Sequence, residues 1–455
     1  HENTTGSFLT AVGNDSLFNN TTGDNNSGGG YYSLRENTTG DNNTGFGRNA
    51  LAVNTTGSQN TAVGSLALDA NTTTSNNTAV GYAALSANTT GRNTAFGSQA
   101  LKDVQTTDHN TAIGDHCLWK TTTGSNNTGL GFQALVFNTT GSQNVAVGAD
   151  SLDSNTTGSF NIAVGHDALQ ANTTGGYNVA IGQTALGAAT TVSHNTAVGG
   201  GALERATTAN NTAIGFGCLG QNTSGGINTG LGSYSLFLNT TGDNNTAVGH
   251  NSLGNNTTAD NNTAVGHYAL NANTTGGSNT AVGCNALDAN TTGFSNVAVG
   301  DNALGGNTTS HNSTAVGQIA LSVSTGGNNT GLGCASLRYN TSGTNNVAVG
   351  AFALEDNTTA ANNTAVGYNS LTANTTGPQN VAVGNYALDA NTTGEKNVAI
   401  GYETLTNATT ATYNVAVGIH ALEEATTGGT NTAVGSFALE KNTTATNNVA
   451  VGYVA

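Results

Sequence analysis

One motif, repeated at an almost fixed interval, constrains this chain more than any other feature. The glycine that closes an Asn-Thr-Ala-Val-Gly-like segment stands at 27 positions from Gly13 to Gly452, and of the 26 intervals 23 are 17 residues long and three are 16. A fixed period of this kind is typical of solenoids, in which each repeat forms one coil. Seventeen residues are too few for a helical hairpin, so the period predicts an all-β parallel β-solenoid, or β-roll, of about 26 coils.

The positions within the repeat indicate the path of one coil. The unit reads N-[T/V]-A-[V/I]-G-x-x-A-L-x-x-N-T-T-G-x-x, with a Leu four residues after each of the first 26 glycines. The Thr-Ala-Val segment is predicted to be a short strand, and the Ala-Leu segment a second one. The Gly is expected at a corner that has no room for a Cβ atom. Asn-Thr-Thr-Gly and the two residues after it form the predicted wide turn.

The three short repeats identify the loop. Each loses one residue between its Leu and the next Asn, in segments 91–93, 209–211 and 326–329. Deletions confined to one segment are typical of a loop. The strands are therefore expected to keep their register, and residues 1–455 to form a single continuous solenoid domain with no separate cap, stalk or anchor.

The conserved spacing also predicts the interior and the side-chain ladders. The predicted core includes Leu68, Leu85, Leu101, Leu118, Leu135, Val63 and Val80. An Asn ladder is predicted before the Thr-Ala-Val segment, at Asn60, Asn77, Asn93 and Asn110. A second Asn row follows the Leu by three residues in 19 of the 26 repeats and creates N-x-T sequons, for example at Asn71, Asn88, Asn138 and Asn155. These asparagines are expected either to carry N-linked glycans or to form another buried ladder.

Composition limits the partners of the chain. Charged residues make up 7% of the sequence, and 25 acidic against nine basic residues give a net charge of −16. Binding to the phosphates of a nucleic-acid backbone requires clustered Lys and Arg, so no nucleic-acid partner is expected. No run of 18 apolar residues occurs, which predicts no membrane span. A single coil buries little apolar surface relative to the entropy lost in ordering it, so we expect self-association as a homotrimer or a filament.

The repeat resembles a known family. The stretch from Asn60 to Ala67, and that from Asn363 to Ser370 with Ser in the Ala position, resembles the head repeat of trimeric autotransporter adhesins. It is also similar to tandem repeats of phage tail-fibre proteins. The resemblance implies a left-handed β-roll, three identical chains, and display on a cell or virion surface. The unit here is a few residues longer than the adhesin repeat, because of the Asn-Thr-Thr-Gly loop.

The four cysteines interrupt the repeat without suggesting chemistry. Cys117 and Cys218 replace the Ala beside the Leu, whereas Cys284 and Cys334 follow the corner Gly. Each pair lies several coils apart, too far for a disulfide between their Cα atoms. We expect the cysteines to act as small buried substitutes for Ala, with an intermolecular disulfide or a reactive thiol as the alternative.

Histidines and aromatic residues gather in the two positions after the corner Gly. His250 and His267 occupy adjacent coils and are expected to stack, while His116, His166 and His420 are expected to have no partners. No metal site, cofactor or catalytic group is predicted. The candidate exposed row comprises Tyr82, Phe132, Phe216, His250, His267, Tyr268, Tyr368, Tyr386 and Tyr402. It is expected either to bind a host-surface glycan or protein receptor, or to pack against neighbouring chains.

These features together predict a non-enzymatic, extracellular structural or adhesive fibre. One alternative is a filament subunit that polymerises end to end, since solenoid edges need caps or partners. Another is an ice-binding solenoid that uses rows of Thr. Against the ice-binding hypothesis, Val or Ile often replaces the strand Thr, as at Val145, Ile162, Val179 and Val347.

Overall fold

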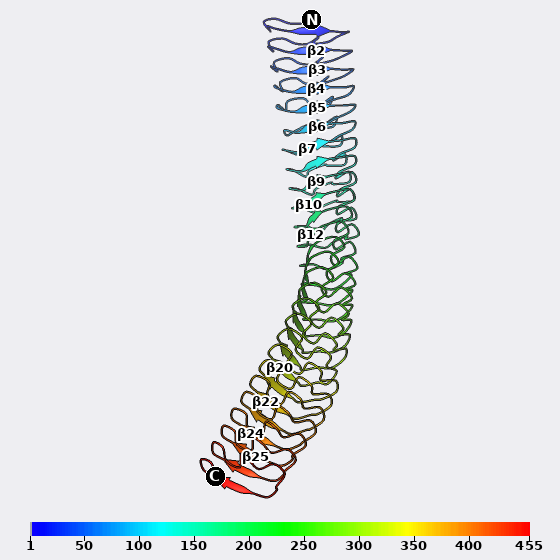
Figure 1. Ribbon diagram of the computed structural model, residues 1–455. Helices are drawn as coiled ribbons and strands as arrows, with labels where there is room; N and C mark the ends of the chain where they lie inside the picture. The colour runs from blue at the N-terminus through cyan, green and yellow to red at the C-terminus, as the bar shows by residue number, and fades with distance from the viewer. Residues whose placement is uncertain (1) are drawn as a thin grey trace. The chain divides into compact units, whose positions relative to one another are not determined.

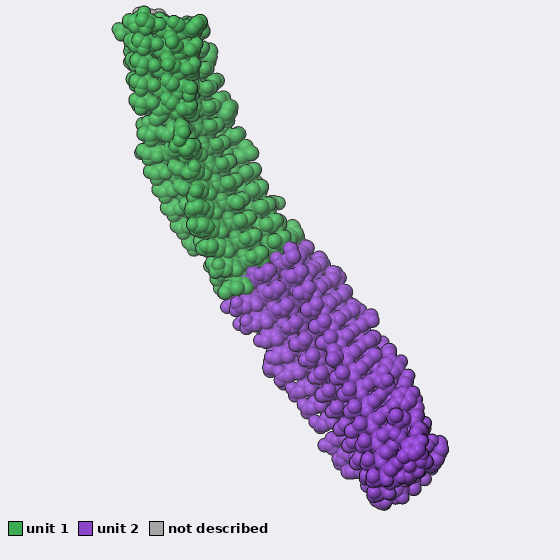
Figure 2. All heavy atoms as spheres, turned by 90° about the vertical axis from the view of Figure 1, so that its left-hand side faces the viewer, with its two compact units in different colours: residues 1–227 green, residues 228–455 purple. Residues whose placement is uncertain are grey.

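The chain is all-β and folds as a parallel β-solenoid. The computed structural model describes residues 2–455 and divides them into two compact units, unit 1 ending at Ile227 and unit 2 running from Asn228 to Ala455 (Figure 2). Each coil contributes one three-residue strand, and the strands of a unit stack along it in chain order (Figure 1). No helix occurs in residues 2–455. The fold class predicted from the period is confirmed, while the expectation of one continuous domain stays a prediction.

The strands of the two units have the following bounds. Unit 1 contains β1 (Thr10–Val12), β2 (Ser27–Gly29), β3 (Thr44–Phe46), β4 (Thr61–Val63), β5 (Thr78–Val80), β6 (Thr94–Phe96), β7 (Thr111–Ile113), β8 (Thr128–Leu130), β9 (Val145–Val147), β10 (Ile162–Val164), β11 (Val179–Ile181), β12 (Thr196–Val198) and β13 (Thr212–Ile214). Unit 2 contains β14 (Thr229–Leu231), β15 (Thr246–Val248), β16 (Thr263–Val265), β17 (Thr280–Val282), β18 (Val297–Val299), β19 (Thr314–Val316), β20 (Thr330–Leu332), β21 (Val347–Val349), β22 (Thr364–Val366), β23 (Val381–Val383), β24 (Val398–Ile400), β25 (Val415–Val417), β26 (Thr432–Val434) and β27 (Val449–Val451).

Adjacent strands pair in parallel, and each residue lies beside the same position of the next repeat. Thr61 pairs with Thr78 between β4 and β5. The register is unchanged across a 16-residue repeat, where Thr78 pairs with Thr94. The short repeats therefore absorb their deletion in the loop, as their spacing predicts.

The Ala-Leu segment is a tight turn, so the prediction of a second strand is wrong. Leu68 has a φ of +52° and Leu66 a φ of +61°, and the same left-handed backbone recurs at the equivalent residues of the other coils. Two left-handed residues separated by one other reverse the chain within a few residues, which a strand cannot do. The Leu68 backbone N–H still donates to the carbonyl oxygen of Ala84 on the next coil, at 3.0 Å. Burial of the side chain offsets the cost of about 1 kcal/mol for left-handed Leu.

Leu and Ala fill the interior. The predicted core residues Leu68, Leu85, Leu101, Leu118 and Leu135 are completely buried, which confirms that part of the prediction. The prediction is wrong for the valines, since Val63 is 38% exposed and Val80 is only half-buried. Side chains alternate between the two faces of a strand, and the small Ala between Thr and Val points inward. The Thr and the Val on either side of it therefore point outward.

An Asn precedes 25 of the 27 strands and forms a buried ladder, as predicted at Asn60, Asn77, Asn93 and Asn110. The side-chain oxygen of Asn60 accepts from the backbone N–H of Asn77 at 3.0 Å. Its Nδ2 donates to the carbonyl oxygen of Thr74 at 2.8 Å. Each side chain therefore joins consecutive coils and satisfies buried backbone groups that would otherwise lack partners. Where Ser313 replaces the Asn, its hydroxyl still accepts from the N–H of Asn329, at 3.3 Å.

The second Asn row also lies inside, which contradicts N-glycosylation of the folded chain. Asn71, Asn88, Asn138 and Asn155 are completely buried. The Nδ2 of Asn71, the atom that would carry a glycan, donates to Asn54 Oδ1 at 2.9 Å. The ladder interpretation of these sequons is the one that agrees with the structure.

Candidate functional site

The outer surface of a coil includes a sheet face, a corner edge and a loop edge. The sheet face consists of the first and third residues of each strand, which point outward. The corner edge consists of the two residues after each corner Gly, and the loop edge of the two residues before each ladder Asn. On the face shown in Figure 2, the coils form regular ridges along each unit.

The sheet face carries no charge. Its first position holds Thr, Ser, Val or Ile and its third position Val, Ile, Leu, Phe or Gly in all 27 strands. The 25 acidic and nine basic residues all lie elsewhere. Apolar side chains more than a third exposed recur along this face, at Phe46, Val63, Phe96, Ile113, Leu130, Ile162, Ile181 and Ile214 of unit 1 and at Leu231, Val282, Val297, Leu332, Val347, Ile400, Val415 and Val434 of unit 2. Each unit thus exposes a continuous apolar and hydroxyl surface.

The residues of the candidate exposed row lie on the corner edge. The exposed members are Tyr82, Phe132, Phe216, His250, His267, Tyr368 and Tyr402, and the half-buried members are Tyr268 and Tyr386. His250 and His267 stack as expected, with ring centroids 5.5 Å apart. The Tyr268 ring stands edge-on to His267 at 4.3 Å. The row expected from the sequence therefore contains local clusters of touching rings.

The longest of these clusters is an aromatic ladder in unit 2. Neighbouring rings are 5.2 to 6.3 Å apart, and most are nearly perpendicular. The aromatic ladder comprises Phe352, Tyr368, Tyr386, Tyr402, His420, Phe437 and Tyr453. It uses the first or the second corner-edge position of each coil, so no single position in the repeat reveals it.

His420 lies within the aromatic ladder and faces two carboxylates. Its Nδ1 is 2.8 Å from Oε2 of Glu423 and 3.5 Å from Oε2 of Glu403. The prediction that His420 has no partner is therefore wrong. Aligned repeats place Glu403 in the position of His420 on the preceding coil, and Glu423 follows His420 by three residues. This cross-coil proximity is the signal that could have identified the cluster.

The other two histidines expected to be without partners also lie beside acidic groups. His166 Nδ1 is 2.8 Å from Oδ2 of Asp167, and Asp150 completes a similar cluster. His116 Nδ1 is 2.8 Å from Oδ1 of Asp115. Both aspartates are the immediate sequence neighbours of their histidine.

Four aspartates that directly follow the core Leu are half-buried, and burial raises the pKa of their carboxyl groups. The pKa is raised at Asp69, Asp153 and Asp288. It is raised to about 6 at Asp389, where burial is the main cause and the charge of Glu403 contributes. At these four aspartates burial therefore disfavours the ionised carboxylate.

None of the four cysteines forms a disulfide within residues 2–455, as expected, but they are of two kinds. Cys117 and Cys218 are buried, which agrees with their role as substitutes for Ala. Cys284 and Cys334 are exposed, so that interpretation is wrong for this pair. Burial raises the pKa of the Cys117 thiol to about 12, so this thiol is not a nucleophile at neutral pH.

The loop edge carries aromatic stacks that the sequence pattern did not reveal. Phe160 stacks on Tyr177 with ring centroids 4.6 Å apart, and Tyr177 stacks on His194 at 5.2 Å. In unit 2, Phe294 stacks on His311 at 4.7 Å. In the unit 1 stack each ring comes from the residue just before the ladder Asn, and in the unit 2 stack from the residue two before the ladder position. The signal was an aromatic side chain that recurs at the same loop-edge position 17 residues later.

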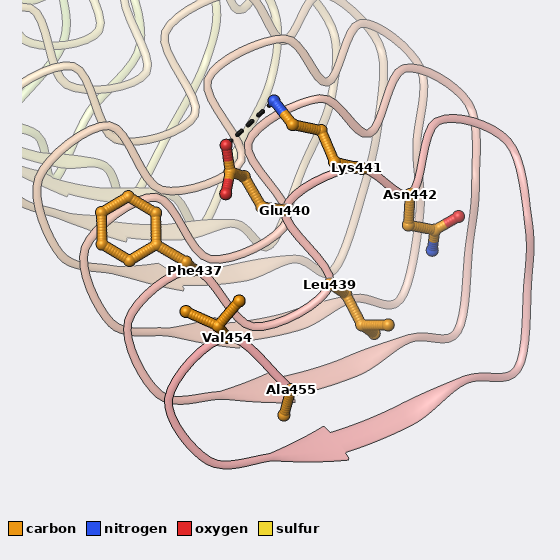
Figure 3. Close-up of a pocket in the computed structure, with 7 residues that line it drawn as sticks. All are labelled: Phe437, Leu439, Glu440, Lys441, Asn442, Val454 and Ala455. Atoms are coloured by element: carbon orange, nitrogen blue, oxygen red, sulfur yellow. Dashed lines mark ion pairs between the residues drawn. The ribbon is translucent and has the colours of Figure 1, made fainter.

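A hollow opens beside the last coil of unit 2 (Figure 3). It is lined by Phe437, Leu439, Glu440, Lys441, Asn442, Val454 and Ala455. Leu439 is half-buried here, whereas the equivalent Leu of the preceding coil, Leu422, is completely buried. In the preceding coils of unit 2, the next coil covers the equivalent Leu. The hollow therefore corresponds to the surface on which one coil packs against the next, and it supports no ligand site.

Comparison with models of known protein families gave no match, and comparison with curated proteins gave no similar sequence. Within residues 2–455, no helix is long and apolar enough to cross a membrane.

Proposed function

We propose that this chain is a non-enzymatic structural and adhesive element of an extracellular fibre, and that copies of it associate laterally through the sheet face. The observation that carries the proposal is the complete segregation of charge from that face. Two outward residues on each of 27 strands include none of the charged side chains. An extended exposed surface of this kind is typical of an interaction site.

Self-association suits the spacing as well as the chemistry of the sheet face. Parallel strands lie about 4.8 Å apart in any β-solenoid, so the side-chain rows of two copies have the same repeat and can interleave. The net charge of −16 would keep copies apart if it lay on this face. Because the charged residues lie outside the sheet face, two sheet faces meet without bringing like charges into contact.

The aromatic corner edge is the adhesive part of the proposal. Tyr and Phe supply large contact areas at low entropic cost and are enriched where proteins bind partners. The aromatic ladder presents seven rings at fixed spacing on one edge of unit 2. A glycan or protein on a host surface is the partner that this edge would contact, while the sheet face remains available for assembly.

Analytical ultracentrifugation of two matched double variants tests the assembly surface. Ile113→Lys with Leu130→Lys adds two charges to the sheet face, where both residues are exposed. Tyr82→Lys with Phe132→Lys adds the same charge to the corner edge. The expected result is an oligomer for the native chain and the corner-edge variant, and dissociation for the sheet-face variant, with circular dichroism confirming the fold of each.

Other outcomes would overturn this assignment. A native mass of 45.1 kDa would exclude self-association. Dissociation of the corner-edge variant alone would make the aromatic row the assembly surface. Filaments that persist in the sheet-face variant under electron microscopy would favour end-to-end polymerisation, the alternative expected from the sequence.

A run of threonines favours ice binding as a second candidate function. Six consecutive strands, β3 to β8, carry Thr at the first outward position. The run consists of Thr44, Thr61, Thr78, Thr94, Thr111 and Thr128. A monomer that shows thermal hysteresis, with the effect lost in Thr94→Lys, would support this function in place of lateral assembly.

A further inference from the structure

The Nδ1 atom of His420 is buried and makes no hydrogen bond. It nevertheless faces Oε2 of Glu423 at 2.8 Å and Oε2 of Glu403 at 3.5 Å. One ligand atom from each of the three residues lies within 4.8 Å of the other two. A zinc ion about 2.1 Å from each of its ligands separates them by roughly 3.4 Å in tetrahedral geometry. The two distances from His420 Nδ1, 2.8 and 3.5 Å, lie on either side of this spacing.

We propose that Glu403, His420 and Glu423 form a binding site for one divalent transition-metal ion of the zinc class. An imidazole nitrogen with two carboxylate oxygens is a donor set suited to Zn²⁺. The three side chains are half-buried, Glu403 and His420 on the corner edge and Glu423 beside it, so water completes the coordination. The site is separate from the sheet face and does not depend on the proposed assembly.

The solenoid holds two of the ligands in fixed positions. Glu403 and His420 occupy the same corner-edge position on adjacent coils, with φ values of +50° and +56°. The backbone N–H of His420 donates to the carbonyl oxygen of Tyr402 at 3.1 Å, and that of Glu403 to Asn385 at 3.1 Å. The inter-coil ladder thus fixes the backbone from which both ligands project, as a preorganised site requires.

Neighbouring aromatic residues orient the ligands. The His420 ring lies against Phe437 at 5.2 Å with an angle of 19° between the planes, and Tyr402 contacts it edge-on at 5.8 Å. A hydrogen bond with Glu403 raises the pKa of the Tyr402 hydroxyl. Such outer contacts set the direction of metal ligands, which makes Tyr402 a positioning residue.

The charge of the site favours a cation. Two carboxylates converge on one imidazole, and across residues 2–455 neither Glu403 nor Glu423 makes an ion pair with Lys or Arg. Lys441 lies nearby in the sequence, but it pairs with Glu424 and Glu440. A divalent ion would offset the repulsion between the two carboxylates.

Unit 1 provides an internal comparison. Asp150, His166 and Asp167 form a cluster with the same kinds of ligand. The side chain of His166 is 55% exposed, against 21% for His420. Water competes more strongly for an exposed cluster, so the ion is expected to bind more tightly at His420.

Equilibrium dialysis of the full chain against Zn²⁺ tests the proposal. All proteins carry Cys284→Ser and Cys334→Ser, because exposed thiols also bind zinc. His420→Gln and Glu423→Gln are expected to lower the affinity of the tightest site at least tenfold, and His166→Gln to leave it unchanged. Tyr402→Phe is expected to weaken it by about tenfold, the effect of losing an outer-shell contact.

Co²⁺ provides a second readout at the ligands themselves. Visible absorption of bound Co²⁺ should report nitrogen ligation and should change in His420→Gln but not in His166→Gln. Thermal melts without metal verify that each variant folds. Equal zinc affinity and stoichiometry in the Cys284→Ser, Cys334→Ser parent and in its His420→Gln variant would overturn the proposal, whatever the oligomeric state of the protein.

Discussion

A Cβ atom added at Gly64 would lie 2.4 Å from the carbonyl oxygen of Gly81 on the next coil. Gly64 also has a φ of +134°, a conformation that side chains disfavour. Gly64→Ala is therefore expected to destabilise the neighbouring coils by about 3 kcal/mol, through overpacking and backbone strain. Hydrogen exchange of the surrounding backbone amides is the appropriate measurement, because long repeat arrays do not always unfold in two states.

Gly200→Ala provides a matched control for this prediction. The nearest atom to an added Cβ at Gly200 is on the Phe216 ring, at an ordinary contact distance of 3.4 Å. Gly200→Ala should change the free energy of unfolding by no more than about 0.5 kcal/mol. Similar losses of protection from hydrogen exchange in both variants would show that the close approach between coils does not cause the destabilisation.

The orientation of the strand side chains gives a second prediction. Leu68 is completely buried and Val63 is exposed, although both are large and apolar. Leu68→Ala should cost about 3 kcal/mol because it leaves a cavity. Val63→Thr should change the free energy of unfolding by less than about 1 kcal/mol, as for a surface residue. Thermal melts of both variants decide, and a larger effect at Val63 would contradict the observed orientation.

The repeat determined the fold because a fixed period leaves few ways to stack coils. Identical spacing on both sides of a deletion also predicted the parallel register. The orientation of Val63 was missed because a three-residue strand has too few alternations to reveal its inner face. The left-handed backbone of Leu68 could not be predicted from residue preferences either. Leu rarely adopts this conformation, and only the burial of its side chain offsets the cost.

The candidate site was harder to predict for a different reason. Glu403 and His420 are 17 residues apart, and only the stacking of coils brings them together. The candidate exposed row included Tyr368, Tyr386 and Tyr402, but the sequence pattern did not indicate that their rings lie only 5.5 and 6.3 Å apart on successive coils. An alignment of the repeats that includes both corner-edge positions would have revealed the aromatic ladder.

Asp69 gives a prediction about pH. Burial raises its pKa above the usual 3.8, so the folded chain holds the proton more tightly than the unfolded chain. Ionising this buried carboxyl lowers the free energy of unfolding. The loss of stability is absent below pH 3.8, grows as pH rises toward the folded pKa, and is constant above it. Asp69→Asn should therefore stabilise the chain at pH 7, by about 1 kcal/mol given its partial exposure, but not at pH 3. Melting temperatures at both pH values test this, and a pH-independent difference would contradict it.

The cysteines give a prediction about reactivity. Cys284 and Cys334 are exposed, whereas Cys117 and Cys218 are buried. A colorimetric thiol reagent at pH 8 should modify two thiols rapidly in the folded chain and all four after denaturation. Cys117→Ala should leave the rapid phase unchanged, and Cys284→Ala should halve it. A rapid phase of four thiols would show that the interior is open.

Every paired strand residue has the same position of the adjacent repeat as its partner, as at Thr61 and Thr78. A gene that gained or lost a whole repeat by unequal recombination would therefore encode a solenoid with all of its remaining ladders intact. The number of coils is free to change during evolution in steps of one repeat. Frame-preserving changes within the strand segment have no such freedom, because a shift of one residue would turn Asn and Ala outward.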